Sequence, residues 1–202
     1  MISAVILAAG ESRRMGKQNK LLLRLGGETL LVKLVKSVCD SDIGQVLVVI
    51  GHEAENIRRE LNNFPLSFVY NPNFSEGITT SIKSGVKVVS PDCDGLLICL
   101  ADMPFINTTE INKLIHVYVK NRIKGKRLIV VPVFQGHRGN PVLFSSEFRN
   151  NILEHKKESG CKGVIMNNSE YVKEIEMDDD NMLLDLDTME DYQRATGAFV
   201  SE

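Results

Sequence analysis

Glycines and cations directly follow an apolar run near the N-terminus, a combination typical of sites that hold phosphate. Residues 5–23 read VILAAGESRRMGKQNKLLL, with cations at Arg13, Arg14, Lys17 and Lys20. Small residues behind a strand let backbone N–H groups approach phosphate oxygens, and the cations add the opposite charge. A solvated basic turn is an equally good interpretation of these charges taken alone.

The loop follows neither of two well-known glycine-rich patterns. Five residues separate Gly10 from Gly16 where the P-loop has four, and Gln18 stands where the P-loop has the serine or threonine that binds Mg²⁺. The pattern G-x-G-x-x-G is also absent, which disfavours a dinucleotide-dependent oxidoreductase. The sequence therefore indicates an anion site of another kind.

Carboxylates that could hold a metal follow two further apolar segments. Asp102 ends the run GLLICLAD and precedes Met103 and Pro104, and a proline there stops the strand. A carboxylate at the carboxyl end of a parallel strand projects into the crevice where α/β sheets bind ligands. A turn aspartate that bonds its own backbone is the alternative. In LLDLDTMED, Asp185 and Asp187 share one face of an extended segment; Asp187 is the better second ligand, although it also suits a helix cap.

Apolar, β-branched runs alternate with helical patterns along most of the chain. We expect strands at Ser3–Ala9, Gln45–Ile50, Ser67–Tyr70, Gly95–Leu100, Arg127–Phe134 and Pro141–Phe144. We expect helices at Thr29–Cys39, Ala54–Leu61, Ile78–Val89, Thr108–Asn121 and Thr188–Ala195, the last two opened by capping boxes. Continuous apolar strands between helices predict an α/β fold with a mostly parallel sheet covered on both faces. The last two strands have no helix between them, which predicts an antiparallel excursion.

Length and composition narrow the class of protein. The 202 residues fit one α/β domain, carry a formal net charge of −2 and show no basic half, which argues against nucleic acid as a partner. The four cysteines have no ligand spacing, and the apolar run at the N-terminus is too short for a signal peptide or a membrane span. We therefore expect a single domain over residues 1–202, located in the cytoplasm and without a membrane partner.

The string LAAGESRRMGKQNKLLL closely resembles the L-A-A-G-x-S-x-R-M-G signature of nucleotidyltransferases that activate sugar phosphates, isoprenoid precursors and the molybdenum cofactor. Within this MobA-like superfamily, the chain looks like the molybdopterin (molybdenum cofactor) cytidylyltransferase family. The strings NPNFSEGITTSIKSG, LADMPF, GNPVLF and DLDTMEDY fall in the order in which that family carries similar strings. The resemblance extends from Val5 to about Tyr192 and implies a three-layer, Rossmann-like nucleotide-diphospho-sugar transferase fold.

The resemblance also implies roles for particular residues. Arg14 and Lys20 match positions that stabilise the triphosphate and the charge developing on the α-phosphorus, and Asp102 matches an aspartate that binds Mg²⁺ or Mn²⁺. Mg²⁺ needs only one or two protein carboxylates when phosphates and water complete its shell, so Asp187 would suffice as the second. The nucleotide would be contacted by Leu7, Ala8, Ala9, Gly10, Lys20, Asn71, Gly77 and Ser81. For Asn71 and Ser81, the alternatives are Asn-Pro turn chemistry and a solvated helix face.

The residues that would contact the acceptor are less well specified. The family often has Gly-His-Pro where this chain has Gly139, Asn140 and Pro141. His137, Arg138 and Asn140 either contact an acceptor phosphate or pterin, or are polar residues of a hairpin turn.

The resemblance implies transfer of CMP from CTP to the terminal phosphate of molybdopterin, releasing pyrophosphate and forming molybdopterin cytosine dinucleotide. The string Ala8-Ala9-Gly10 is similar to the cytidylyl branch, whereas the guanylyl branch usually has Ala-Gly-Gly. A phosphate monoester is already ionised at neutral pH, so no general base is required. The alternatives are guanylyl transfer from GTP, transfer to a sugar phosphate, and a non-catalytic carrier of the molybdenum cofactor. A recipient molybdenum hydroxylase is a further partner that the resemblance allows.

Overall fold

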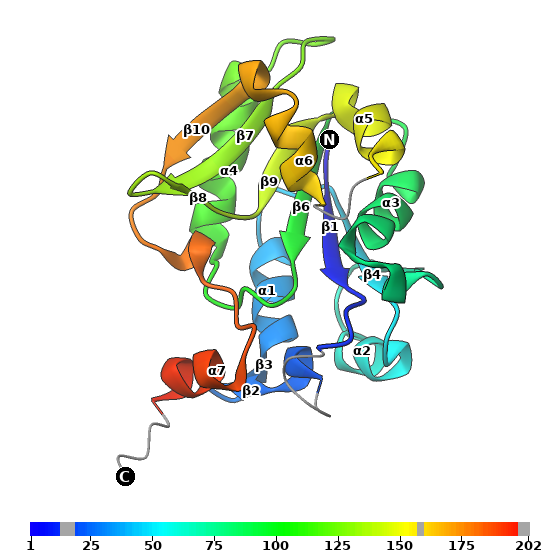
Figure 1. The fold of residues 1–202 in the computed structure, drawn as a ribbon, viewed down its shortest axis with the longest axis vertical. Helices are drawn as coiled ribbons and strands as arrows, with labels where there is room; N and C mark the ends of the chain where they lie inside the picture. Colours follow the sequence, from blue (N-terminus) through cyan, green and yellow to red (C-terminus); the bar gives the residue numbers. More distant parts are fainter. Residues whose placement is uncertain (13–18, 157–159, 198–202) are drawn as a thin grey trace.

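The computed structural model describes residues 1–12, 19–156 and 160–197, and a mostly parallel sheet forms its centre (Figure 1). The strands of this sheet are β1 (Ile2–Ala8), β4 (Gln45–Ile50), β5 (Ser67–Tyr70), β6 (Gly95–Leu100), β7 (Ile129–Phe134), β8 (His137–Arg138), β9 (Val142–Ser145) and β10 (Val172–Glu176). Their order is β10-β7-β9-β6-β1-β4-β5, with β8 paired to β7. Because β1, β4, β5 and β6 run in the same direction, their carboxyl ends meet at one edge of the sheet.

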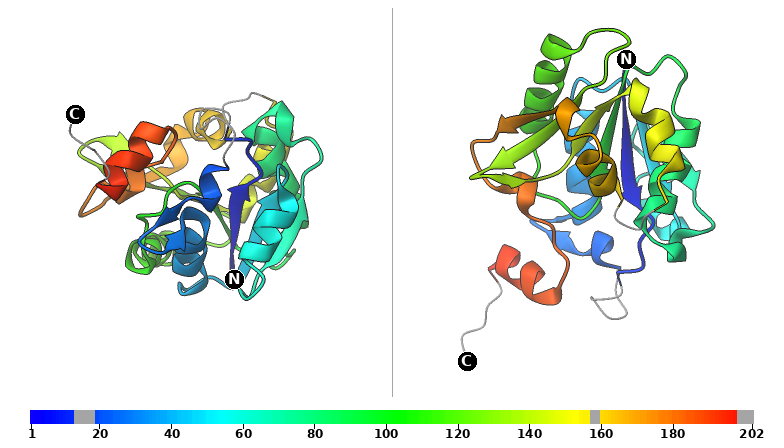
Figure 2. Two further views of the ribbon diagram at one scale, coloured as in Figure 1. Left: turned by 90° about the horizontal axis from the view of Figure 1, so that it is seen from below. Right: turned by 45° about the horizontal axis from the view of Figure 1, so that its top comes forward.

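Helices cover both faces of the sheet (Figure 2). The helices are α1 (Leu30–Cys39), α2 (Ala54–Glu60), α3 (Ile78–Val88), α4 (Thr108–Asn121), α5 (Arg149–Glu154), α6 (Cys161–Met166) and α7 (Met189–Thr196), and a small hairpin of β2 (Arg24–Leu25) and β3 (Glu28–Thr29) precedes α1. One apolar layer joins α1, α2 and α4 to the sheet, and the other joins α3, α5 and α6 to the opposite face. Alternate β1 residues enter the two layers, so Ile6 packs in the first and Val5 in the second. The predicted three-layer α/β fold is confirmed.

The antiparallel excursion predicted for the second half of the chain is present. β9 lies between β6 and β7 and runs antiparallel to both. β7 turns into β8 through Gln135 and Gly136, whose φ values of 50° and 81° are those of a two-residue hairpin turn. β10 then returns in parallel beside β7 at the sheet edge.

The predicted elements lie within two residues of their observed bounds, but β10, α5, α6 and the two-residue strands β2, β3 and β8 were not predicted. β10 reads VKEIE, and its two apolar residues, Val172 and Ile175, pack against opposite layers. A strand with one apolar residue per face gives almost no alternation. α5 and α6 have six residues each, too few to establish a helical period. None of the helices in the described part of the chain has the length and apolar character needed to cross a membrane.

α3 approaches β1 closely because Gly85 faces the sheet. A Cβ added to Gly85 would lie 2.3 Å from Val5 Cγ1 and 2.9 Å from Val49 Cγ2. Any side chain at this position would therefore push α3 away from the sheet. The close contact fixes the distance between α3 and the sheet, and it thereby positions the first turn of this helix at the carboxyl edge of the sheet.

The N-terminus of α4 has the predicted capping box and holds a buried carboxyl group. Asn107 Oδ1 accepts from Glu110 N at 3.1 Å, and Glu110 Oε2 accepts from Asn107 N at 2.8 Å. Burial raises the pKa of Glu110 to about 7, and a hydrogen bond with Asp179 contributes in the same direction. The second predicted capping box, between Thr188 and Asp191, opens α7.

Candidate active site

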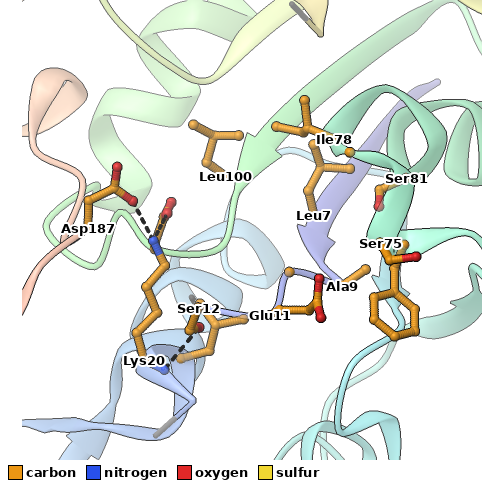
Figure 3. A pocket seen from close by; sticks show the side chains of 15 residues that line it. Leu7, Ala9, Glu11, Ser12, Lys20, Ser75, Ile78, Ser81, Leu100 and Asp187 are labelled. Atoms are coloured by element: carbon orange, nitrogen blue, oxygen red, sulfur yellow. Dashed lines mark hydrogen bonds and ion pairs between the residues drawn. The ribbon is translucent and has the colours of Figure 1, made fainter. Parts of the chain in front are cut away.

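A cavity of about 380 Å³ opens at the carboxyl edge of the sheet, beside the ends of β1 and β6 and the first turn of α3 (Figure 3). Its walls include Leu7, Gly10, Lys20, Ser81, Asp102 and Asp187. Open α/β sheets bind their ligands at this edge. The cavity thus joins residues from both ends of the chain at the position expected for a ligand.

The ammonium group of Lys20 lies between two carboxylates (Figure 3). Lys20 Nζ donates to Asp102 Oδ2 at 2.5 Å and to Asp187 Oδ1 at 2.6 Å. The side chains of Lys20, Asp102 and Asp187 are 13%, 17% and 26% exposed, so water screens their contact only weakly. Burial alone would lower the pKa of Lys20, but the two carboxylates outweigh burial and raise it. Lys20 is therefore a cation at neutral pH.

Local backbone contacts hold Lys20 in this position. Lys20 opens a short 3-10 helix, Lys20–Leu22, and Asn19 caps it by accepting from Leu21 N at 3.1 Å. Lys20 N also donates to Ser12 Oγ at 3.2 Å. The Ser12 hydroxyl thus bridges the loop that leaves β1 and the turn that carries Lys20.

A main-chain hydrogen bond brings the two carboxylates together. Leu186 N donates to Asp102 O at 3.0 Å, which ties the segment after β10 to the residues that follow β6. Asp187 consequently lies beside Lys20, whereas Asp185 does not line the cavity. Burial raises the pKa of Asp185, and the negative charges of Asp187 and Asp102 raise it further. Asp187 is the carboxylate that shares Lys20 with Asp102.

The two carboxylates fit a divalent cation that brings further ligands with it. Asp102 Oδ1 is buried and has no hydrogen-bond partner among the described residues, so one oxygen is available to a ligand. Carboxylate oxygens are the ligands that Mg²⁺ and Mn²⁺ prefer. Within residues 1–12, 19–156 and 160–197, no group of three or more His, Cys, Asp or Glu side chains could hold a metal by itself. Phosphate oxygens of a substrate would have to complete the shell.

Most of the residues expected to contact the nucleotide line the cavity. Those that do so are Leu7, Ala9, Gly10, Lys20, Gly77 and Ser81. Ala8 and Asn71 are buried behind its wall. Arg14, expected at the triphosphate, lies outside the described residues.

Asn71 braces the cavity wall from behind. Its Nδ2 donates to Thr80 Oγ1 at 2.9 Å and to Ser81 Oγ at 3.0 Å, while its Oδ1 accepts from Asn73 N at 3.0 Å. The amide is therefore satisfied inside the protein, partly by the turn chemistry that the sequence allowed. It holds the loop after β5 against α3 and fixes Ser81, which is buried in the wall and not on a solvated helix face.

A second cavity of about 340 Å³ adjoins the first and shares Leu7, Ile78 and Leu100 with it. Two of the three residues expected near the acceptor, Arg138 and Asn140, line this second cavity. The two cavities form neighbouring compartments at the same edge of the sheet.

The third expected acceptor residue, His137, lies elsewhere. It is exposed on β8, its Nδ1 is 3.1 Å from Gln135 O, and it lines neither cavity. Phe74, Ile78 and Leu100 also line the first cavity, although no motif in the sequence marks them as site residues. The sequence could have indicated them only by their position, because they lie near the predicted residues Gly77 and Asp102.

Known proteins share this sequence pattern and fold. Residues 4–172 match the family described as the MobA-like NTP transferase domain. The chain belongs to this family. Nucleotidyl transfer is the activity of the domain, and the chain is a nucleotidyltransferase; the resemblance drawn from the sequence motifs is confirmed at this level.

Three known proteins are similar to this chain over nearly its whole length. The molybdenum cofactor cytidylyltransferase of Escherichia coli (strain K12) is 25% identical over 192 residues, covering 95% of this chain and 93% of that protein. The nicotine blue oxidoreductase of Paenarthrobacter nicotinovorans is 24% identical over 195 residues, covering 96% and 95%. The crystal structure of a Mycobacterium tuberculosis Rv0371c homologue from Mycobacterium sp. strain JC1 matches with a TM-score of 0.83 and 28% identity, covering 98% and 96%.

Proposed function

We propose that this MobA-like nucleotidyltransferase transfers CMP from CTP to the terminal phosphate of molybdopterin and releases pyrophosphate. The observation that carries the proposal is the Lys20 ammonium held between Asp102 and Asp187 in a cavity beside Gly10. A cation and carboxylate metal ligands beside a glycine turn are the groups that phosphoryl-type transfer requires. The cytidylyltransferase of E. coli supports CTP and molybdopterin as the substrates.

The proposed reaction needs no proton transfer by the protein. An ionised oxygen of the acceptor phosphate attacks the α-phosphorus of CTP, and a new P–O bond forms there. The bond from the α-phosphorus to the oxygen that bridges to the β-phosphate breaks, and pyrophosphate leaves. Because the acceptor oxygen is already ionised at neutral pH, the side chains of the cavity serve to position the substrates and to stabilise charge.

The charged residues of the first cavity would act on the phosphates. Asp102 and Asp187 would hold Mg²⁺ or Mn²⁺, which when bound supplies positive charge to the phosphate oxygens. Lys20 would donate from its ammonium group to phosphate oxygens and stabilise the charge that develops during transfer. Arg14 keeps the role that the family resemblance gives it, as a second cation at the triphosphate.

The small and hydroxyl-bearing residues would contact the rest of the nucleotide. Ala9 and Gly10 leave their backbone accessible because neither has a bulky side chain. Ser81 accepts a hydrogen bond from Asn71, so its own proton is available to an oxygen of the base or ribose. Gly77, at the start of α3, gives the ligand access to the N–H groups of that helix.

Pyrophosphate release is the direct test. Purified protein would be incubated with molybdopterin, Mg²⁺ and one of CTP, GTP, UTP or ATP. We expect release with CTP, and a fall of roughly 100-fold or more in the rate for Asp102→Asn, because the variant loses the negative charge and one of the two carboxylate oxygens. Asp178→Asn is the matched control, since its carboxylate is 91% exposed and pairs with Lys113 at the surface; its rate should match that of the wild type.

Other outcomes would identify a different activity. Release with GTP alone would indicate guanylyl transfer, and release only with sugar phosphates as acceptors would replace molybdopterin. A protein that binds CTP and molybdopterin without release would be a carrier. If no triphosphate is bound, a redox activity like that named for the P. nicotinovorans relative becomes the candidate to assay. A molybdenum hydroxylase that receives the product stays a prediction from the family resemblance.

A further inference from the structure

Lys20 contacts the same carboxylate oxygens that a divalent cation would need. Its Nζ lies 2.5 Å from Asp102 Oδ2 and 2.6 Å from Asp187 Oδ1, and Figure 3 shows its side chain directed at Asp187. A divalent cation bound to either oxygen at about 2.1 Å would lie within about 5 Å of the ammonium nitrogen. The three side chains are at most 26% exposed, so water would screen the repulsion between the two cations only weakly. The ammonium group and a divalent cation therefore compete for the two carboxylates.

The second oxygen of Asp102 does not remove this competition. Asp102 Oδ1 is buried and has no hydrogen-bond partner among the described residues, so it could accept a metal by itself. A cation on Oδ1 alone would have a single protein ligand and would still face the positive charge of Lys20 on the same carboxylate. Binding through both Asp102 and Asp187 therefore requires the ammonium group to leave its position between them.

The ammonium group can move while the backbone that carries it stays in place. Lys20 N donates to Ser12 Oγ at 3.2 Å, and Asn19 caps the short 3-10 helix that Lys20 opens. The ammonium group itself lies at the end of a flexible four-carbon stem. Because the Lys20 side chain is only 13% exposed, the ammonium group needs another anion once it leaves the carboxylates. Gly10 and Ser12 line the same cavity, so a phosphate held beside them would supply that anion.

The charges of the site favour binding of metal and phosphate together. A divalent cation alone would leave the ammonium group in a weakly screened site without its two partners. A triphosphate alone would meet two carboxylates that one ammonium group neutralises only in part. When both are present, phosphate oxygens accept from the ammonium group and complete the ligand shell of the metal. Each of the two ligands thus removes the charge that opposes the other.

We propose that Lys20 blocks the metal site of the nucleotide-free protein and is displaced onto a phosphate when a nucleoside triphosphate and a divalent cation bind together. The inference rests on the proposed function, since it names how the site of that transfer is regulated. Metal and nucleotide then raise each other's affinity by the same factor. In the absence of nucleotide, the contact of Lys20 with Asp102 and Asp187 keeps the affinity for metal low.

Metal binding without nucleotide measures the block directly. Mn²⁺ is titrated into the intact protein at neutral pH, and electron paramagnetic resonance measures the free ion. Lys20→Met should bind Mn²⁺ at least about tenfold more tightly than the wild type, because the competing cation is gone. Lys113→Met is the matched control, since it also removes one lysine charge but from a pair with Asp178 at the surface, and it should bind Mn²⁺ like the wild type.

A second variant keeps this test decisive. Lys20→Gln removes the charge but keeps a hydrogen-bond donor, and it replaces Lys20→Met if thermal unfolding shows that the methionine protein does not fold. The inference is wrong if the folded variant binds Mn²⁺ no more tightly than the wild type.

The position of the Lys20 side chain separates displacement from simple repulsion between charges. The probe is the ¹⁵N signal of the Lys20 ammonium group, assigned as the lysine signal that the Lys20 variant lacks. We expect Mg²⁺ together with CTP to shift this signal, whereas Mg²⁺ alone or CTP alone at the same concentration should leave it in place. A signal that stays in place while calorimetry shows Mg²⁺ and CTP binding would overturn the inference, as would a full shift with Mg²⁺ alone.

The same signal separates this inference from the proposed function. A signal shifted by Mg²⁺ with GTP or ATP, in a protein that transfers no CMP, would uphold the displacement of Lys20 and reject the proposed function. CMP transfer to molybdopterin by a protein whose Lys20 signal does not respond to Mg²⁺ and CTP would do the reverse.

Discussion

Replacing Lys20 with methionine would leave Asp102 and Asp187 facing each other without the cation between them. Their side chains are 17% and 26% exposed, and that of Lys20 is 13% exposed, so the contact is closer to a buried than to a surface ion pair. Exposed pairs are worth about 0–1 kcal/mol, whereas removing one partner of a buried pair costs roughly 3–5 kcal/mol. Partial screening by water puts the expected loss in the free energy of unfolding at about 2–3 kcal/mol. For a chain of this length, the loss corresponds to a fall in Tm of roughly 4–12 °C.

Thermal unfolding followed by circular dichroism, near neutral pH and without divalent cations, measures this loss. The matched control is Lys113→Met, because Lys113 pairs at 3.0 Å with the exposed carboxylate of Asp178; we expect a change below about 1 kcal/mol for the control. Adding Mg²⁺ should then raise the Tm of Lys20→Met more than that of the wild type, since the ammonium group of Lys20 no longer competes for the two carboxylates in the variant.

Two results would refute this reasoning. A Lys20→Met protein that unfolds at the temperature of the wild type would mean that water or other groups already compensate the carboxylates. A double variant, Lys20→Met with Asp187→Asn, should recover part of the loss because one of the two facing charges is gone. If the double variant is no more stable than Lys20→Met, repulsion between Asp102 and Asp187 is not the cause.

Four further perturbations test other parts of the structure. The pKa of Glu110 is raised to about 7, so the folded state binds this proton more tightly than the unfolded state, and wild-type stability falls as pH rises from the ordinary glutamate pKa through 7. Urea unfolding should show a loss on the order of 2 kcal/mol between about pH 5 and about pH 8, and Glu110→Gln should abolish this loss. Equal pH dependence in both proteins would contradict the prediction. Asn71→Ala should cost about 1–3 kcal/mol in urea unfolding and raise the KM for CTP more than it lowers kcat, because Ser81 loses its brace; an unchanged KM would show that Ser81 does not depend on Asn71. Gly85→Ala should destabilise the protein by roughly 1–3 kcal/mol in the same measurement, since its Cβ would meet Val5, and a wild-type value would mean that α3 shifts without cost. Gly10→Ala should leave Tm unchanged, because among the described residues, chain neighbours aside, no atom lies within 4 Å of the added Cβ. The same change should weaken CTP binding in calorimetry because it narrows the cavity, and a fall in Tm would contradict the first expectation.

Features that depend on neighbouring residues were predictable from the sequence. The capping boxes at Asn107 and Thr188 lie where the sequence indicated, because each needs only one residue and another three positions later. The central strands were equally clear, since β1, β4 and β6 are apolar on both faces. β10 was missed because it lies at the sheet edge and presents charged residues to solvent.

The contacts inside the site were not predictable in the same way. Lys20 and Asp102 were each assigned to a phosphate or a metal, but their contact with each other depends on two segments separated by 82 positions. The role of Asn71 was likewise hidden, because an amide before proline suits a ligand contact, a turn or an internal brace equally well. Only the positions of Thr80 and Ser81 around it decide between these roles. Local sequence gives the chemical type of each group, and tertiary packing decides its partner.

The hydrogen bond from Leu186 N to Asp102 O joins the segment that carries Asp187 to the residues after β6. α7, which follows directly, buries none of its residues, so little apolar packing holds the end of the described chain in place. Segments of this kind detach at a small fraction of the free energy needed to unfold the whole protein. Leu186 itself is 4% exposed, so an opening must extend beyond α7 to Leu186 before it carries Asp187 away from Lys20 and exposes the Leu186 amide proton to solvent. The hydrogen-exchange rate of the Leu186 amide therefore reports how often Asp187 leaves Lys20 and only Asp102 stays paired with it.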